Sequence, residues 1–211
     1  LDLSFRGLRV LPSELRLSSK TRFLLLAGNP LSQLPEDFPE LPSLEVLDLS
    51  GCSLTRIPNW VFRLPKLRIL RLTMNPLTML APELLGLTSL EELSLQGSPI
   101  GTLPEHLDRL VQLRELNLSH TRLSSLPSSL GQISMLQVLQ LKGVRVESWP
   151  CLDGLIALRR LDLNGCGLQR MPRGLSSLAQ LETLSLSGNP LGTLPVFRRG
   201  ERYGCGPLPY R

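Results

Sequence analysis

Long apolar runs and aromatic side chains are both scarce in this sequence. Aromatic residues make up 4% of the 211 residues, and charged residues make up 19%. The longest apolar stretch, from Phe23 to Gly28, is far shorter than the ~18 residues that a membrane-spanning helix needs. The sequence therefore predicts no membrane span.

Cysteine spacing and charge limit the classes of function further. Net charge is 23 − 18 = +5, and the last sixteen residues carry +3 of it, so residues 1–195 carry about +2. This distribution does not build a phosphate-binding face, and we expect no nucleic-acid partner. We also expect reduced, intracellular thiols, because the four cysteines show neither a CxxC motif nor the dense clusters of secreted modules: Cys52, Cys151, Cys166 and Cys205.

Leucine is the abundant residue, with 54 copies among the 211 positions. The 18 prolines are spread along the chain and exclude a long coiled coil. A hydrophobic content of 42% excludes a disordered chain. Such heavy use of one side chain indicates a structure that needs it at the same place many times.

The leucines follow an internal repeat of 23 residues. One copy, LEVLDLSGCSL, begins at Leu44, and an apolar-Pro pair such as Leu103-Pro104 follows in the second half of most units. One step, to Leu158, is 22 residues. Leu1 opens in the middle of a unit, so the register holds nine copies. The other copies begin at Thr21, Leu67, Leu90, Leu113, Leu136, Leu158 and Leu181.

Each unit is expected to form a short strand, a turn and a short helical return. Apolar residues alternate within LxL, as in a strand with one buried face, and later recur at helical or 3₁₀ spacing. One unit buries roughly seven apolar side chains, worth ~10–20 kcal/mol, whereas ordering its residues costs at least ~1 kcal/mol each. A single unit therefore cannot stand alone, and stacked units can.

This pattern, LxxLxLxxNxL followed by xxLPxxLxxLxx, resembles the leucine-rich repeat family over residues 1–195. The unit length is similar to the intracellular class found in Ras-pathway and LAP-type scaffolds. The resemblance implies an α/β solenoid of about nine repeats, a curved horseshoe with a parallel sheet on the concave face and short helical or 3₁₀ returns on the convex face. Residues 196–211 form either a tail or a partial cap. We expect a fragment, because no N-terminal cap precedes Leu1.

The sequence offers no group of residues suited to catalysis. P-loop and GxSxG motifs are absent, and His106 and His120 lie fourteen residues apart without a metal-ligand pattern. Cys52 and Cys166 occupy the ninth position of the repeat, where a polar side chain bonds the turn backbone. Val144 cannot make such a bond, which predicts an irregularity around residues 142–152. We expect no enzyme, cofactor or metal.

The variable positions around LxL are expected to form a partner-binding surface on the concave side. Apolar residues in the first half should make a patch with a charged margin, as protein interfaces often have. Alternatively, Val and Ile there reflect strand propensity, and Phe23 and Leu25 cover a missing cap. The predicted site comprises Phe5, Phe23, Leu25, Val46, Asp48, Ile69, Arg71, Met74, Glu92 and Glu115.

The first functional hypothesis is a cytoplasmic, non-enzymatic scaffold that binds a protein partner on its concave face. The second is the recognition part of a larger enzyme or receptor, such as a ubiquitin ligase, kinase or immune sensor. A third, an extracellular receptor domain, would be supported by a glycan on Asn117, which begins an Asn-Leu-Ser sequon.

Overall fold

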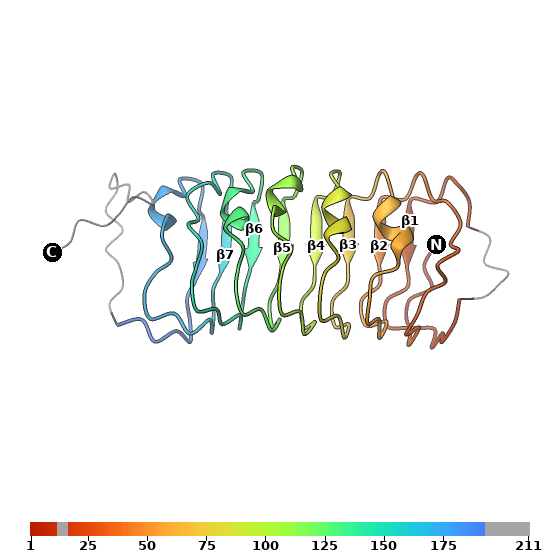
Figure 1. The fold of residues 1–211 in the computed structure, drawn as a ribbon, viewed down its shortest axis with the longest axis horizontal. Helices are drawn as coiled ribbons and strands as arrows, with labels where there is room; N and C mark the ends of the chain where they lie inside the picture. The colour runs from red at the N-terminus through yellow and green to blue at the C-terminus, as the bar shows by residue number, and fades with distance from the viewer. Residues whose placement is uncertain (12–16, 193–211) are drawn as a thin grey trace.

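The computed structural model describes residues 1–11 and 17–192 of the chain. The described residues form eight strands in one parallel sheet, in the same order in space as in sequence (Figure 1). The strands are β1 Phe23–Leu25, β2 Val46–Asp48, β3 Ile69–Arg71, β4 Glu92–Ser94, β5 Glu115–Asn117, β6 Val138–Gln140, β7 Arg160–Asp162 and β8 Thr183–Ser185. An isolated bridge between Asp2 and Leu25 adds the strand position of the partial first unit, which gives nine units in the described residues.

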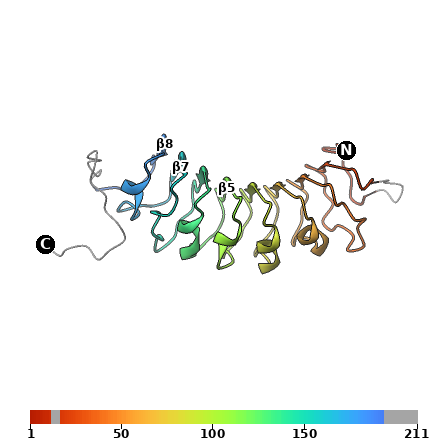
Figure 2. The same cartoon turned by 90° about the horizontal axis from the view of Figure 1, so that it is seen from above.

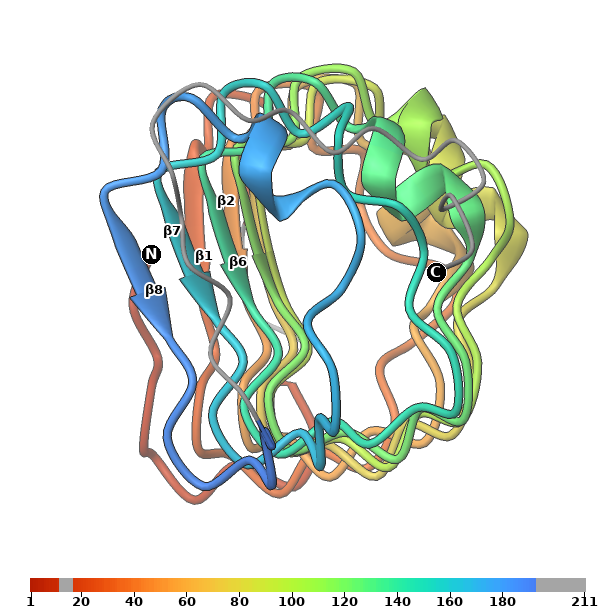
Figure 3. The same cartoon turned by 90° about the vertical axis from the view of Figure 1, so that its left-hand side faces the viewer.

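The returns contain short 3₁₀ helices, as the spacing after the prolines predicts. They are η1 Asn59–Arg63, η2 Pro82–Gly86, η3 Leu107–Arg109, η4 Ser128–Gln132 and η5 Leu175–Ser177. Seen from above, strands and helices occupy opposite long sides of a shallow arc, with the strands on the inner side (Figure 2). Seen from one end, the successive coils superimpose around a common interior (Figure 3). The expected solenoid with a concave parallel sheet is therefore confirmed.

Leucines at equivalent positions form one continuous core inside the coils. Within β2, Leu47 is fully buried whereas Val46 and Asp48, on either side of it, remain partly exposed. The strands β1, β3, β5, β6 and β7 repeat this alternation, whereas Ser94 of β4 is also buried and Leu184 of β8 is half-buried. Strand pairing matches equivalent positions of adjacent units, for example Val46 with Ile69 and Leu47 with Leu70. This register stacks leucine on leucine inside and aligns the variable residues in rows on the concave face.

The ninth position of the repeat ties adjacent turns together. The buried Asn75 side chain accepts N–H bonds from Cys52 and Leu54 at 3.1 and 2.9 Å and donates to the carbonyls of Leu49 and Leu72 at 2.8 and 3.0 Å. Asn29 makes the four equivalent bonds and Asn189 three of them, each tying its unit to the preceding one. The expected structural role of this position is confirmed, because otherwise buried backbone groups would lose their partners.

The unit that contains Val144 differs from its neighbours. Val144 is fully buried and its backbone N–H donates to the Leu141 carbonyl at 2.9 Å, so the turn closes without a polar side chain. No helix forms in the described return between β6 and β7, where the repeat is one residue short. Coils pack closely here: a Cβ on Gly131 would overlap the Cys151 carbonyl. The return between β1 and β2, also among the described residues, has no helix either. The irregularity predicted around residues 142–152 therefore stays a prediction.

Residues 196–211, predicted as a tail or partial cap, lie outside the described residues, as does Cys205. In the described part of the chain, no helix is long and apolar enough to cross a membrane.

Candidate functional site

The concave face carries an apolar row at the first residue of three consecutive strands. Strand register places Phe23 beside Val46 and Val46 beside Ile69. Phe23 is 48% exposed and the other two are half-buried. The guanidinium of Arg22 lies 5.5 Å from the centre of the Phe23 ring, within the range of a cation–π contact. We refer to Phe23, Val46 and Ile69 as the apolar row.

Leu25, Asp48 and Arg71 form a second row, two residues further along the same strands. Asp48 accepts the backbone N–H of Ser50 at 2.9 Å through one carboxylate oxygen. Asp2, Asn117 and Asp162 cap their own turns in the same way. The carboxylate of Asp48 is thus held by its turn, and only its second oxygen remains for a partner.

Charged residues lie next to the apolar row, on the side toward the centre of the sheet. Arg71 of β3 donates two hydrogen bonds to the Glu92 carboxylate of β4, at 2.8 and 3.1 Å. This bonding raises the pKa of the Arg71 guanidinium above its ordinary value. Glu115 on β5 is exposed and forms no ion pair within the described residues. A small hollow of about 80 Å³ opens between Glu92, Glu115, Asn117, Val138 and Gln140.

Phe5 and Met74 lie apart from the apolar row. Both occupy the eighth position of their units, past the strand ends, and are 80% and 66% exposed. Five residues of nearly extended chain separate that position from the apolar row, a distance of roughly 10–15 Å. The predicted site therefore divides into the apolar row with its charged neighbours and two separate side chains at the strand exits.

Ion pairs between adjacent units cross the entrance edge of the sheet. Arg22 pairs with Glu45 and Arg68 with Glu91, each at 2.8 Å. Arginine bonding lowers the pKa of both carboxylates. Arg159 and Glu182 add a third pair at 3.0 Å. Between them, Arg114 faces Gln137 at the same position of the next unit and makes no ion pair within the described residues.

Cys52 and Cys166 take no part in a reactive site. Cys52 and Cys166 are buried free thiols that donate to the carbonyls of Leu26 and Leu141. Burial raises the pKa of both thiols to about 11, which disfavours the nucleophilic thiolate. Cys151 is disulfide-bonded, against the expectation of reduced thiols at every position. Within residues 1–11 and 17–192, no three His, Cys, Asp or Glu side chains are arranged to hold a metal ion.

A feature that sequence reasoning did not single out lies at the strand exits. Pro76, Pro99 and Arg122 border a hollow between Met74 and His120. The signal was present in the sequence: the eighth position is glycine in six of nine units, and Met74 and His120 depart from that rule. Arg122 likewise stands where Pro76 and Pro99 stand in earlier units.

Family models identify the repeat directly. Models described as leucine rich repeat match residues 19–77 and 65–123, one described as leucine-rich repeat region matches residues 101–188, and another matches residues 180–198. Together they span residues 19–198. No curated protein sequence matches the chain.

Solved structures share the fold. A leucine-rich repeat protein of Leptospira interrogans is 26% identical, with a TM-score of 0.72 over 93% of this chain and 56% of its own. The FLRT2 repeat domain, in an octameric complex with Latrophilin 3 and Unc5D, is 27% identical, with a TM-score of 0.72 over 88% of this chain and 58% of its own. TLR13 in complex with ssRNA13 is 26% identical, with a TM-score of 0.65 over 78% of this chain and 25% of its own.

The chain thus spans little more than half the length of the first two of these structures. Domains of this fold are generally non-enzymatic modules for protein–protein interaction, which use the concave surface that stacked units create. Repeat length, strand register, the asparagine bonds and the family models agree, and the chain belongs to the leucine-rich repeat family.

Proposed function

We propose that this chain is a non-enzymatic module that binds a protein partner on its concave face, with the apolar row as the anchor. The observation that carries the proposal is the alignment of Phe23, Val46 and Ile69 on three neighbouring strands. These strands have one face open to solvent, and polar side chains are usual on such a face. Burying a side chain of this kind is worth about 1.5–3 kcal/mol when exposure is complete, so three partly exposed ones supply a useful fraction of a binding energy.

The charged neighbours of the row would set specificity rather than affinity. Arg71 and Glu92 already neutralise each other, whereas Glu115 has no cation partner within the described residues. A partner that places a basic side chain over Glu115, next to its apolar contact, therefore fits the face best. Mismatched charges at this place would exclude other partners, because an unpaired charge at a closed interface is costly.

The rigid sheet suits such capture. Every strand pairs with its neighbours in register, and equivalent bonds of the ninth position tie the turns. A surface that does not rearrange loses little conformational entropy when it binds. The module would work by presenting its face, without a chemical step.

The test substitutes the apolar row with Phe23→Ser, Val46→Thr and Ile69→Thr. Mass spectrometry of proteins that copurify with the wild-type chain identifies the partner. The variant with all three substitutions should no longer capture that partner, while its circular dichroism spectrum and melting temperature stay close to those of the wild type. The control carries Arg63→Ser on η1, exposed on the opposite side of the coil. Capture undiminished by the three changes would contradict the proposal.

We further propose a cytoplasmic location. The 23-residue unit supports it, and so does Asn117, whose side chain donates to Gln96 and accepts from Ser119 and is therefore occupied within the sheet. The disulfide at Cys151 favours an oxidising compartment and hence the alternative of an extracellular receptor domain. Mass spectrometry of the protein from its own cells tests the location: an unmodified Asn117 is expected, and a glycan on Asn117 would establish the alternative.

A further inference from the structure

At the eighth position of the repeat, three exposed side chains occupy a backbone conformation that favours glycine. The eighth residue of each unit lies in the left-handed region, and six of the nine units place glycine there. Phe5, Met74 and His120 adopt the same conformation, with φ of 56°, 55° and 58°. A residue with a Cβ is strained at such a φ. All three side chains are exposed, so core packing does not explain why the chain tolerates this conformation, which the exposed Ser32, Ser53 and His106 also adopt elsewhere.

Each of these side chains leans over the glycine of the next unit. A Cβ on Gly28 would overlap the Phe5 ring, and a Cβ on Gly97 would overlap the Met74 thioether. A Cβ on Gly143 would lie 2.9 Å from Nδ1 of His120. Each large side chain therefore packs over a glycine of the next unit, and the three side chains lie along the strand exits.

Met74 and His120 form two walls of an open hollow of about 410 Å³. The other walls that matter are Pro76, Pro99 and the backbone of Gly97, with Arg122 at the margin. Thioether, imidazole and proline surfaces all pack well on a flat ring, and a guanidinium stacks on one. Hollows of this size hold small ligands or a large side chain. The lining therefore suits an aromatic side chain better than an aliphatic one.

One basic residue, Arg122, lines the hollow, and two more lie in the next unit. Arg122, Lys142 and Arg145 are exposed at the exits of β5 and β6, and none forms an ion pair with another residue of the described chain. Arg68 and Arg71 are paired with carboxylates of neighbouring units, whereas Arg122, like Arg63 and Arg114, is left without an ion pair within the described residues. Free cations beside a hollow complement a ligand that carries negative charge next to its ring.

We infer that this hollow is a second docking point, which takes an aromatic side chain from an acidic segment of the protein partner. The inference rests on the proposed function, since it assigns a further contact to the same partner at the edge of the same face. Single-stranded nucleic acid also combines rings with negative charge. It fits less well, because its binding sites use a long basic track, whereas Glu92 and Glu115 lie on the adjoining sheet and residues 1–195 carry a net charge of only about +2.

The probe is a fluorescein-labelled peptide with tryptophan at the centre of two Asp-Glu pairs, measured by fluorescence anisotropy at low salt. Matched peptides replace tryptophan with alanine, or the acids with Asn and Gln. A hexanucleotide of single-stranded RNA is the third competitor. The Trp-acidic peptide should bind at least tenfold more tightly than either matched peptide and than the RNA. Equal binding of the alanine peptide, or tighter binding of the RNA, would overturn the inference.

Two variants locate the binding. Arg122→Glu should weaken peptide binding at least tenfold, whereas Arg63→Glu, the same charge change on η1, should leave it within twofold. His120→Gly restores the glycine that six other units carry, so it should weaken binding without lowering the melting temperature. Peptide binding that survives both changes at the hollow would overturn the inference.

The apolar-row variant separates this inference from the proposed function. Phe23→Ser, Val46→Thr and Ile69→Thr lie at the other edge of the sheet and should leave peptide binding unchanged. Loss of partner capture together with intact peptide binding supports both proposals. Intact partner capture in that variant refutes the apolar row as anchor and leaves the hollow to be judged by its own variants.

Discussion

Replacing Asn75 with alanine should cause one of the largest single losses of stability in this molecule. The side chain is 1% exposed and bonds four backbone groups, two N–H groups and one carbonyl of the preceding unit and one carbonyl of its own unit. Leucines enclose the site, so water does not easily replace these bonds. Leaving a buried polar group without a partner costs about 1–3 kcal/mol, and four such groups should together cost about 4 kcal/mol or more.

Urea unfolding followed by far-ultraviolet circular dichroism measures this loss. Asn75→Cys is the matched variant, because Cys52 and Cys166 occupy the same position and donate one thiol bond each; it should lose about half as much. Asn189→Ala should also lose less, because Asn189 is only half-buried and solvent reaches its partners. A loss below about 1 kcal/mol for Asn75→Ala, or equal losses at both asparagines, would refute the bonding argument.

Three further predictions concern the thiols, the strand exits and the sheet entrance. Burial raises the pKa of Cys52 and Cys166 to about 11, so the folded chain holds these protons more tightly than the unfolded chain. The free energy of unfolding should therefore be full below pH 9.0 and fall as the pH rises toward 11. Iodoacetamide at pH 8 should label neither thiol before the chain unfolds. A melting temperature that stays constant between pH 9.0 and about 11, or labelling of the native protein, would contradict the burial of these two thiols. Gly28→Ala should lower the free energy of unfolding by more than about 1 kcal/mol, because φ is +69° and the Phe5 ring lies where the Cβ would go. Phe5→Gly in the same chain should recover part of that loss. If it recovers none, the Phe5 ring does not overlap the added Cβ. Gln137→Glu should complete the ion pairs of the sheet entrance and add about 0.3 kcal/mol, a gain that 1 M NaCl removes; a salt-independent gain would have another cause.

The repeat made most of the fold predictable from sequence alone. A period of 23 residues determines which leucines stack, and the strands begin at equivalent residues, as Val46 and Ile69 show. The role of the ninth position followed from the same register. Val144 breaks that rule in the unit that is one residue short, and the return there has no helix, but the return between β1 and β2 lacks a helix as well.

The site was less predictable, because periodicity aligns residues without revealing how far apart the rows lie or what each side chain already contacts. Asp48 looked like a free charge and is held by the N–H of Ser50. Phe5 and Met74 looked continuous with the apolar row and lie past the strand ends. Arg122 departs from the prolines of earlier units in the sequence, but only the hollow beside His120 gave that departure a meaning.

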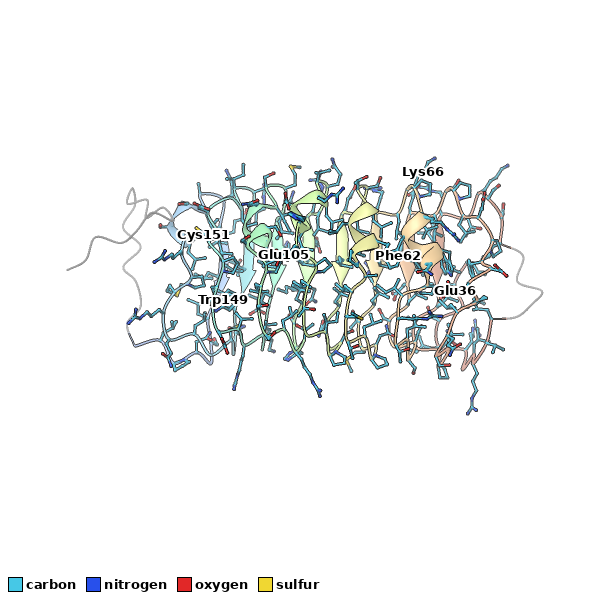
Figure 4. All side chains as sticks on the ribbon, in the orientation of Figure 1. Glu36, Phe62, Lys66, Glu105, Trp149 and Cys151 are labelled. Carbon is cyan, nitrogen blue, oxygen red and sulfur yellow. The ribbon has the colours of Figure 1, made fainter. Side chains whose placement is uncertain are left out.

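Site-specific photocrosslinking tests the central claim, that the concave face holds the partner. Benzoylphenylalanine placed at Val46, in the middle of the apolar row, should form a covalent adduct with the partner in living cells. The same group placed at Arg63 of η1, on the opposite side of the coil (Figure 4 labels the neighbouring Phe62), should form none. Adducts from position 46 alone are the predicted result, and adducts from position 63 alone would contradict the account.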